Sequence, residues 1–488
     1  MLSGRILPLV FVCISTLGKA QLKTSFDSLW MLPDSVQPFT MEAYFSLILK
    51  NHPVARQANL LPEIARQEIR MALGNFDPKL EAGFDTKRYD DKLYYSIASG
   101  SLKIPTRSPI TAILGADRNT GTYLNPEHYI GDEFNYIQYK AGLSIPLGQG
   151  LLTDERRTAL KQAFLFQEMN QAEQVKIINK VLLEAAKHYW DWHYAFHSYR
   201  LITRNVTIAS DIYELVRMNH HQGEASAVDT IQAVITLQQR RLEQQEAWLN
   251  LQNSRITLAN ALWDSTGNPM MPDAHWAPVF DVVQDVPSKA QLEELISQAK
   301  ENHPELRKID VKLRQLETEK RLAKEYLKPN LHINYYALNQ PVNPEGELFG
   351  DVTGSYKFGL GFSMPIFLRK ERSKLSLINL KLSHAALEQI SRQRAVLNEL
   401  EIAYNRLVTQ YAVIEMQFAM MQNYERLLQA EVLNLTQGES DLFKINIQQE
   451  KLLQTQTKWL KLVAEFEKQM AYLYWAAGSS PQIATVIE

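Results

Sequence analysis

The chain has 488 residues, enough for two to four ordinary domains, and its 52 Lys and Arg nearly balance its 54 Asp and Glu. The formal net charge of −2 gives no support for a nucleic acid or another polyanion as a partner. The single cysteine, Cys13, excludes an internal disulfide framework and a thiolate metal site.

Residues 1–20 have the pattern of a secretory signal peptide. Arg5 precedes an apolar run, and the small residues Gly18 and Ala20 predict cleavage after Ala20. A membrane anchor is a weaker interpretation because the run is too short to span a bilayer, and lipidation of Cys13 is another alternative. No later stretch reaches the ~18 apolar residues of a membrane helix. An exported protein is therefore expected, either periplasmic, secreted or forming a membrane β-barrel.

An internal duplication organises the mature chain. After an expected extended segment, 21–37, come two similar halves, 38–287 and 288–488. The tripeptide Asn-His-Pro occurs at His52 and again at His303, 251 residues later. Each copy is predicted to close a short amphipathic helix and to place its proline in the first turn of the next helix. Chance similarity is the alternative, but the helices on both sides match as well.

The first short helix of each half begins at a residue that is typical of a helix N-cap. Thr40 is expected to begin the first short helix, and Ser288 with Gln291 forms a capping box before the second. The halves differ at Pro62, whose counterpart is Leu313. We therefore expect the helix that contains Pro62 to be kinked or to start late.

Alternating apolar and polar residues predict two strands in each half, over 79–85, 137–145, 331–335 and 356–364. This alternation suits an antiparallel sheet packed on a core, and it equally suits a membrane barrel. The first half has 32 extra residues between its strands. They fall within segment 86–135, which is interpreted as an enlarged hairpin with room for added strands.

Two very long helices follow the strands. Residues 151–222 and 366–437 are each 72 residues without Gly or Pro, and a continuous helix of that length measures ~100 Å. Shorter helical runs return after Gly223 and Gly438. Helices of this length imply coiled-coil packing. Four main strands per chain are too few to close a membrane barrel, whose minimum is about eight, so closure needs several chains.

This ordered set of features resembles the TolC family of outer-membrane efflux factors. The resemblance covers essentially the whole mature chain. It rests on the duplication, the strand–Pro–long-helix junctions, and the glycine turns before SAVDTIQAVITLQQ and DLFKINIQQEKLLQ. It implies a mostly α fold with a small β part, in which long coiled-coil helices form a tunnel. Three identical chains would each contribute four strands to a 12-stranded outer-membrane β-barrel.

The resemblance also implies a function. The protein would be a passive exit duct in the outer membrane of a Gram-negative bacterium, surrounded by lipid and extending into the periplasm. Its expected partners are a periplasmic adaptor and an inner-membrane transporter, without nucleic acid, cofactor or enzymatic activity. The main alternative is a non-channel periplasmic or surface coiled-coil interaction protein. An exported enzyme is a further alternative, but the sequence shows no arrangement of catalytic residues.

In members of this family, the helical tunnel narrows at its periplasmic end, near the turns between the long helices. Acidic residues shortly after the turn glycine help to form this constriction. The corresponding turns here are Gly223-Glu224 and Gly438-Glu439.

Six residues beyond these glycines lie Asp229 in the first half and Lys444 in the second. Nine residues beyond lie Gln232 and Ile447. The resemblance makes Asp229, Lys444 and Gln232 the constriction candidates, although the second half lacks the acidic pair. Solvated positions near a turn are the alternative.

Three histidines gather in the middle of the first long helix. His193 and His197 are four residues apart and share a helix face, as metal ligands do. Trp190 and Trp192 crowd the same turns. Aromatic packing is therefore expected for His188, His193 and His197, and no metal site is predicted.

Overall fold

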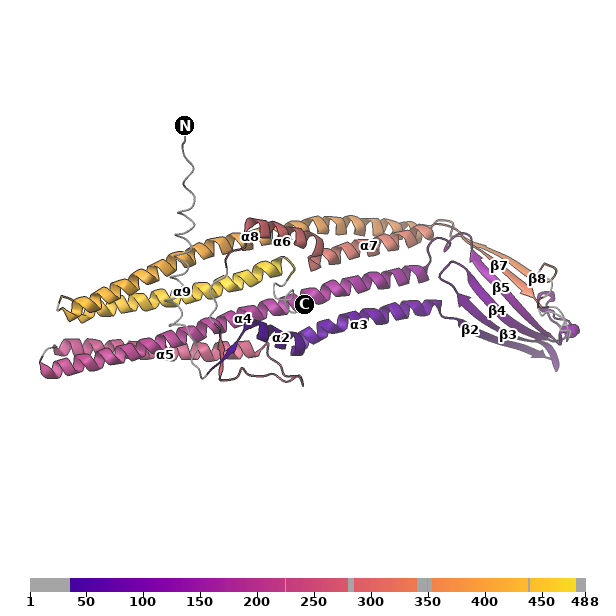
Figure 1. Ribbon diagram of the computed structural model, residues 1–488. Coiled ribbons are helices and arrows are strands. Elements are labelled where there is room, and N and C mark those ends of the chain that lie inside the picture. The colour runs from indigo at the N-terminus through magenta and orange to yellow at the C-terminus, as the bar shows by residue number, and fades with distance from the viewer. Residues whose placement is uncertain are drawn as a thin grey trace, which may run out of the picture. The chain divides into compact units, whose positions relative to one another are not determined.

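The computed structural model describes residues 36–223, 225–279, 285–339, 349, 353–437 and 439–479 (Figure 1). The expected signal peptide and most of the expected extended segment lie outside these ranges. The chain divides into two compact units. One, called the helical unit, contains the described residues of 1–59, 175–304 and 393–488, and the other, called the sheet unit, contains 60–174 and 305–392.

The long helices have the lengths that their Gly- and Pro-free runs predict. Helices α4 (Glu155–Gln222) and α8 (Arg369–Thr436) each have 68 residues, and both begin in the sheet unit and end in the helical unit. The returning helices are α5 (Ala227–Ala259) and α9 (Leu442–Ala476). Of the helices in the described part of the chain, none is both long enough and apolar enough to cross a membrane.

The two Asn-His-Pro sequences form the same break between helices. Helix α2 (Met41–Asn51) ends at His52, and α3 (Pro53–Leu73) begins at the following proline. Helix α6 (Lys289–Asn302) and α7 (Pro304–Glu325) repeat this arrangement around His303. The φ and ψ angles are −60° and 128° at His52 and −58° and 125° at His303, so the predicted break is confirmed in both halves.

The predicted helix starts are also confirmed. Thr40 accepts a hydrogen bond from the backbone N–H of Ala43, and Ser288 forms the capping box with Gln291. Helix α3 begins at Pro53 and contains Pro62 in its interior, so this helix does not start late.

The helical unit has two buried apolar clusters. In one, Leu400, Ala403 and Leu407, which recur along α8 at spacings of three and four residues, are fully buried together with residues of α9. In the other, Tyr44 of α2 and Trp192 of α4 are buried beside a short parallel pair of strands, β1 (Gln37–Phe39) and β6 (Trp276–Pro278). The rings of Phe39 and Trp276 stack across this pair with centroids 4.3 Å apart.

The sheet unit contains one six-stranded antiparallel sheet in the order β2-β3-β4-β5-β7-β8. Short 3₁₀ turns lie beside it at Gly74–Phe76, Pro126–His128 and Asp132–Phe134. The six strands are β2 (Lys79–Tyr89), β3 (Lys92–Pro105), β4 (Thr111–Thr120), β5 (Ile137–Pro146), β7 (Asn330–Leu338) and β8 (Tyr356–Ser363).

The sheet has two strands more than the four predicted for each chain. The difference comes from the enlarged segment, which forms β3 and β4 between β2 and β5. A two-residue turn connects β2 to β3, with φ of 51° at Asp90 and 54° at Asp91. Positive φ at both central residues matches the twist of the flanking strands and favours a tight hairpin. The sequence left the number of added strands open, because Asp-Asp is a weaker turn signal than Asn-Gly or Asp-Gly.

Candidate functional site

One face of the sheet is apolar and exposed to solvent in the single chain. Residues that are Cα partners in neighbouring strands lie on the same face, and Ile145, Ile333 and Leu360 form one such row. Leu360 is 62% exposed. We call this surface the apolar face. Its other exposed large side chains are Leu80, Phe84, Leu114, Tyr139, Leu143, Tyr356, Phe358 and Phe362.

The opposite face, called the polar face, carries the alternate residues of the same strands. Lys357 and Ser363 lie on it in β8, as the period-two pattern predicts. Ion pairs connect neighbouring strands here. Lys140 Nζ lies 2.7 Å from Asp117 Oδ2, and Lys103 Nζ lies 2.6 Å from Glu81 Oε2. An apolar face opposite a charged face is the pattern of a barrel wall between lipid and water.

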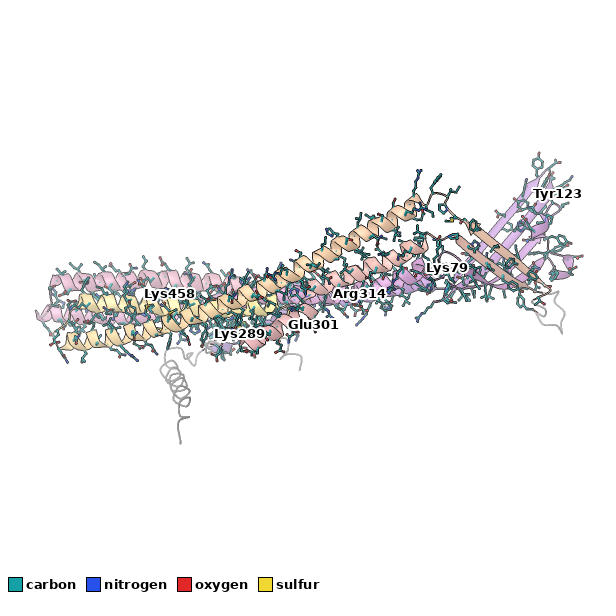
Figure 2. All side chains as sticks on the ribbon, turned by 90° about the horizontal axis from the view of Figure 1, so that it is seen from above. Lys79, Tyr123, Lys289, Glu301, Arg314 and Lys458 are labelled. Atoms are coloured by element: carbon teal, nitrogen blue, oxygen red, sulfur yellow. The ribbon has the colours of Figure 1, made fainter. Side chains whose placement is uncertain are left out.

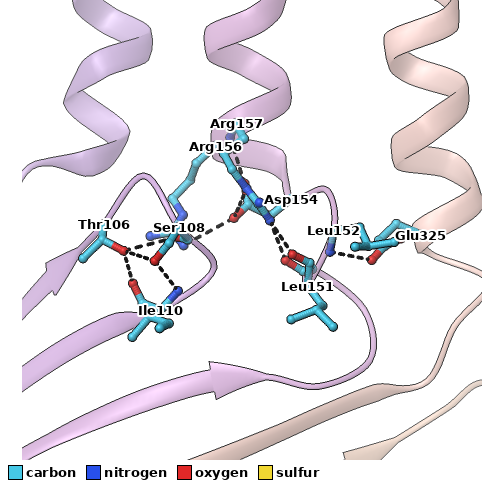
Figure 3. A network of polar contacts seen from close by, with 10 residues as sticks. Thr106, Ser108, Ile110, Leu151, Leu152, Asp154, Arg156, Arg157 and Glu325 are labelled. Atoms are coloured by element: carbon cyan, nitrogen blue, oxygen red, sulfur yellow. Dashed lines mark hydrogen bonds and ion pairs between the residues drawn. The ribbon is translucent and has the colours of Figure 1, made fainter.

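The start of α4 is fixed to the sheet unit by polar contacts (Figure 3). The Asp154 carboxylate accepts a hydrogen bond of 2.8 Å from the backbone N–H of Arg157. The Arg157 guanidinium donates back to the carbonyl of Gly150, at 2.8 Å. The backbone N–H of Leu152 donates to the nearly buried carboxylate of Glu325, which pairs with Lys328 at 2.7 Å. The last turn of α7 and the strand-to-helix junction are therefore held together.

The turn between α4 and α5 requires its glycine. Gly223 has a φ of +83°, which L side chains rarely adopt, and its N–H donates to the carbonyl of His220. Glu224 and Gly438 lie outside the described residues. Glu439 is exposed, and its backbone N–H donates to the carbonyl of Asn434 at 2.9 Å.

Asp229 forms part of a helix cap. Ser226 is the N-cap of α5, and the Asp229 carboxylate accepts from both the backbone N–H and the hydroxyl of Ser226, at 3.0 and 2.8 Å. The cap orients this carboxylate, which sequence reasoning did not foresee. Gln232 is half-buried one turn further along α5.

Lys444 holds the corresponding position in the second half. Asp441 is the N-cap of α9 and accepts a hydrogen bond of 2.9 Å from the backbone N–H of Lys444. The Lys444 side chain is exposed, and Ile447 is 38% exposed. The role of Asp229, Lys444 and Gln232 in a constriction stays a prediction.

An ion-pair cluster that the sequence did not reveal connects the two returning helices. The Arg240 guanidinium of α5 is nearly buried and pairs with Glu243 at 2.7 Å and with Glu450 of α9. A cavity of about 420 Å³ lies beside it, lined by residues of α4, α5 and α9. The pattern of charges in each helix contains no signal for this pairing, because its partners are 210 residues apart.

The central histidines pack as aromatic residues. His193 and His197 are both buried, and their ring centroids are 4.4 Å apart. The ring of Trp190 lies 4.9 Å from that of His193. Burial lowers the pKa of His193 well below its usual value, and burial together with Arg200 lowers the pKa of His197 to about 3. In the described part of the chain, no three His, Cys, Asp or Glu side chains gather as metal ligands do.

Comparison with known proteins supports the recognition made from the sequence. The family model described as outer membrane efflux protein matches residues 295–479. Comparison with curated proteins gives no match.

Among solved structures, the Campylobacter jejuni CmeC outer membrane channel aligns with a TM-score of 0.60 and 15% identity, covering 94% of each chain. The Vibrio cholerae outer membrane protein VceC aligns with a TM-score of 0.61 and 13% identity, covering 90% of this chain and 96% of VceC. The open state of the Neisseria gonorrhoeae MtrE outer membrane channel aligns with a TM-score of 0.61 and 15% identity, covering 90% of this chain and 89% of MtrE.

The fold is therefore that of the outer-membrane efflux channels, and the expected mostly α fold with a small β part is confirmed, with six strands in the described sheet in place of the four expected. The resemblance to the TolC family is confirmed as well, with the family model matching in the second half of the chain. Such channels are transport ducts and not enzymes.

Proposed function

We propose that the protein is the outer-membrane exit duct of a tripartite efflux or secretion system. The sheet carries the proposal, because its apolar face is exposed and its edge strands β2 and β8 have no partner within the chain among the described residues. Unpaired strand edges are not tolerated in a bilayer, so the edges must pair with other chains. Three copies, each with the sheet at the start of α4 and α8, then enclose one continuous passage.

The returning helix α5 offers a surface for a second copy. On α5, apolar side chains recur every seven residues, and each is more than half exposed in the single chain. A heptad stripe of this kind is the seam of a coiled coil. Its members are Val228, Ile235, Leu242, Leu249 and Ile256. We propose that the stripe packs against a neighbouring chain in a homotrimer.

A periplasmic adaptor and an inner-membrane transporter are the further partners that the family resemblance implies. The duct is passive in this proposal, and the transporter supplies the energy. A single cysteine at His221, in the exposed last turn of α4, would be cross-linked to neighbouring periplasmic proteins in cells. Recovery of an adaptor subunit supports the partnership, and recovery of none contradicts it.

Conductance tests the duct itself. Purified protein in a planar lipid bilayer should give discrete channel openings, and outer-membrane fractions should contain a trimer that dissociates on heating. A folded monomer without conductance would instead fit a coiled-coil interaction protein with a small sheet at one end of its helices.

A further inference from the structure

The two inserted strands are full members of the sheet. Strand β3 pairs with β2 from Lys79 opposite Lys103 to Tyr89 opposite Lys92. Strand β4 pairs with β3 over its whole length and with β5 over eight residues. The β3–β4 turn is closed by the Thr106 hydroxyl, which donates to the carbonyl of Ile110 at 2.6 Å (Figure 3). Hydrogen bonding on both sides makes β3 and β4 interior strands.

The inserted strands also continue both faces of the sheet. One row of Cα partners crosses all six strands without interruption, from Leu80 in β2 to Tyr356 in β8. Leu102 and Leu114 are the members of this row in β3 and β4. The ion pairs of the polar face bind the inserted strands to their neighbours, since Lys103 in β3 pairs with Glu81, and Asp117 in β4 pairs with Lys140. The insertion therefore belongs to the wall and does not project from it.

The two edge strands of the sheet, β2 and β8, run in the directions that a closed antiparallel barrel of several copies requires. Successive strands alternate in direction, so β2 and β8, the first and sixth of the row, run opposite ways. Figure 2 shows Lys79, where β2 begins, at one end of the sheet and Tyr123, which follows β4, at the other. Strand β8 of one copy consequently meets β2 of the next as an antiparallel pair, the arrangement of membrane barrels.

We infer that a second copy of this chain occupies each edge, and that three copies close an 18-stranded barrel. This inference rests on the proposed function and replaces the 12-stranded barrel that the family resemblance implies. Barrel diameter grows about linearly with strand number at a given tilt, so the barrel is about 1.5-fold wider. With a strand spacing of ~4.8 Å and a tilt of ~40°, the backbone diameter is about 36 Å and not about 24 Å. The lumen is lined by the polar face, which suits bulky hydrophilic solutes.

Direct counting of strands tests the inference on the unmodified protein. Electron microscopy of the detergent-purified trimer, at a resolution that separates strands, should show 18 strands in one wall. Twelve strands, with β3 and β4 outside the wall, would overturn the inference and leave the exit duct intact. Absence of both a trimer and conductance would instead remove the proposed function.

A deletion provides the matched comparison. Removal of residues 92–120 joins Asp91 to Gly121, both at the same end of the sheet, and leaves β2 to pair with β5. Because two strands are removed together, the apolar face stays on one side. The variant should form a trimer with 12 strands. Neutral polymers that enter the barrel from the outer side should have a limiting radius about 1.5-fold smaller than in the parent. Equal limiting radii in the two proteins contradict the inference.

Cross-linking tests the proposed edge pairing without changing the strand number. The chain after residue 20 has no cysteine, so cysteine pairs report single contacts. Ala82→Cys in β2, combined in turn with Phe358→Cys, Leu360→Cys or Phe362→Cys in β8, should give covalent dimers and trimers on oxidation. The control pair is Ala112→Cys with Leu143→Cys, which are Cα partners within one chain and should give only monomers. Monomers from all the edge pairs overturn the inference.

Discussion

Asp229 and Lys444 are the third residues of α5 and α9, and each lies three residues after the N-cap of its helix. Their backbone N–H groups bond to the N-cap side chains, Ser226 at 3.2 Å and Asp441 at 2.9 Å. The two halves thus place opposite charges at equivalent positions beside their turns. In a trimer with pseudo-sixfold symmetry, three aspartates and three lysines would alternate around one ring.

We predict that this alternating ring favours a closed end. A pair at ~4 Å has a Coulomb energy of up to ~4 kcal/mol at an effective dielectric constant near 20, but its net value in water is ~0–1 kcal/mol. Lys444→Glu should raise single-channel conductance, most strongly at low salt, where screening is weakest. Adding Asp229→Lys should partly restore closure.

The control for the ring separates charge from capping. Asp229→Asn removes the charge but keeps a side-chain oxygen for Ser226, whereas Asp229→Lys also removes that acceptor. If Lys444→Glu conducts like the parent at low salt, or if the charge swap restores nothing, both residues are merely solvated helix positions.

Leu360 should face lipid. Leu360→Arg would place a charge in the bilayer and should reduce stability by roughly 2–4 kcal/mol near the midplane. Gly359→Arg is the control one residue away, because position 359 lies on the polar face and a Cβ there would make only an ordinary van der Waals contact, 4.0 Å from Asn334 Cβ. Outer-membrane assembly should fall for the first variant and persist for the second. Normal assembly of Leu360→Arg would indicate a sheet that does not contact lipid.

The α5 stripe should hold the trimer together. Leu242→Glu replaces an apolar side chain that is 55% exposed in the single chain by a charged one in the predicted seam. We expect the trimer to dissociate at a lower temperature, measured by gel mobility after heating and by light scattering in mild detergent. Gln245→Glu, at an exposed position that is polar already, serves as control. A trimer of unchanged heat stability would place this stripe outside the interface.

Acid should destabilise the helical unit through its buried histidines. The pKa of His197 is about 3 in the folded chain and about 6.5 when unfolded, and that of His193 is also lowered. Both are mostly neutral in either state at pH 7.5. Below about pH 6.5 the unfolded chain binds protons first, so the free energy of unfolding falls by about 1.4 kcal/mol per pH unit for each histidine. The unfolding temperature should therefore drop between pH 7.5 and pH 5.5.

A substitution identifies the source of this pH dependence. His197→Leu should reduce the slope by about half, because His193 remains, whereas His221→Gln, in the exposed last turn of α4, should leave it unchanged. Equal slopes in the parent and in His197→Leu would assign the acid sensitivity to other groups.

The sequence predicted the elements whose signals are local. His52 and His303 end their helices because a proline follows each one, and the glycine at position 223 ends α4 by adopting a conformation that other residues avoid. The alternation in β8 likewise placed Leu360 and Lys357 on opposite faces.

The features that depend on pairing between distant segments were not predictable from one sequence. Segment 86–135 shows alternating runs, but only the register of β3 against both β2 and β4 shows that they enter the wall. The Arg240–Glu450 pair depends on how α5 packs against α9. The capping role of Asp229 had a local signal, Ser226 three residues earlier, that sequence reasoning did not use.

The short turn at Asp90 and Asp91 has a consequence for how such a wall changes during evolution. An inserted hairpin adds two antiparallel strands, so the chain returns to the end of the sheet from which the hairpin started. The strands on either side and the helices after them therefore keep their directions. A single added strand would reverse everything that follows it. Strands are therefore gained by each chain in pairs, and threefold symmetry multiplies each pair to six. The number of strands in such a trimeric barrel therefore increases by six at a time, from 12 to 18 and onward, and the barrel diameter increases with it. One duplicated hairpin in the chain is sufficient for each increase.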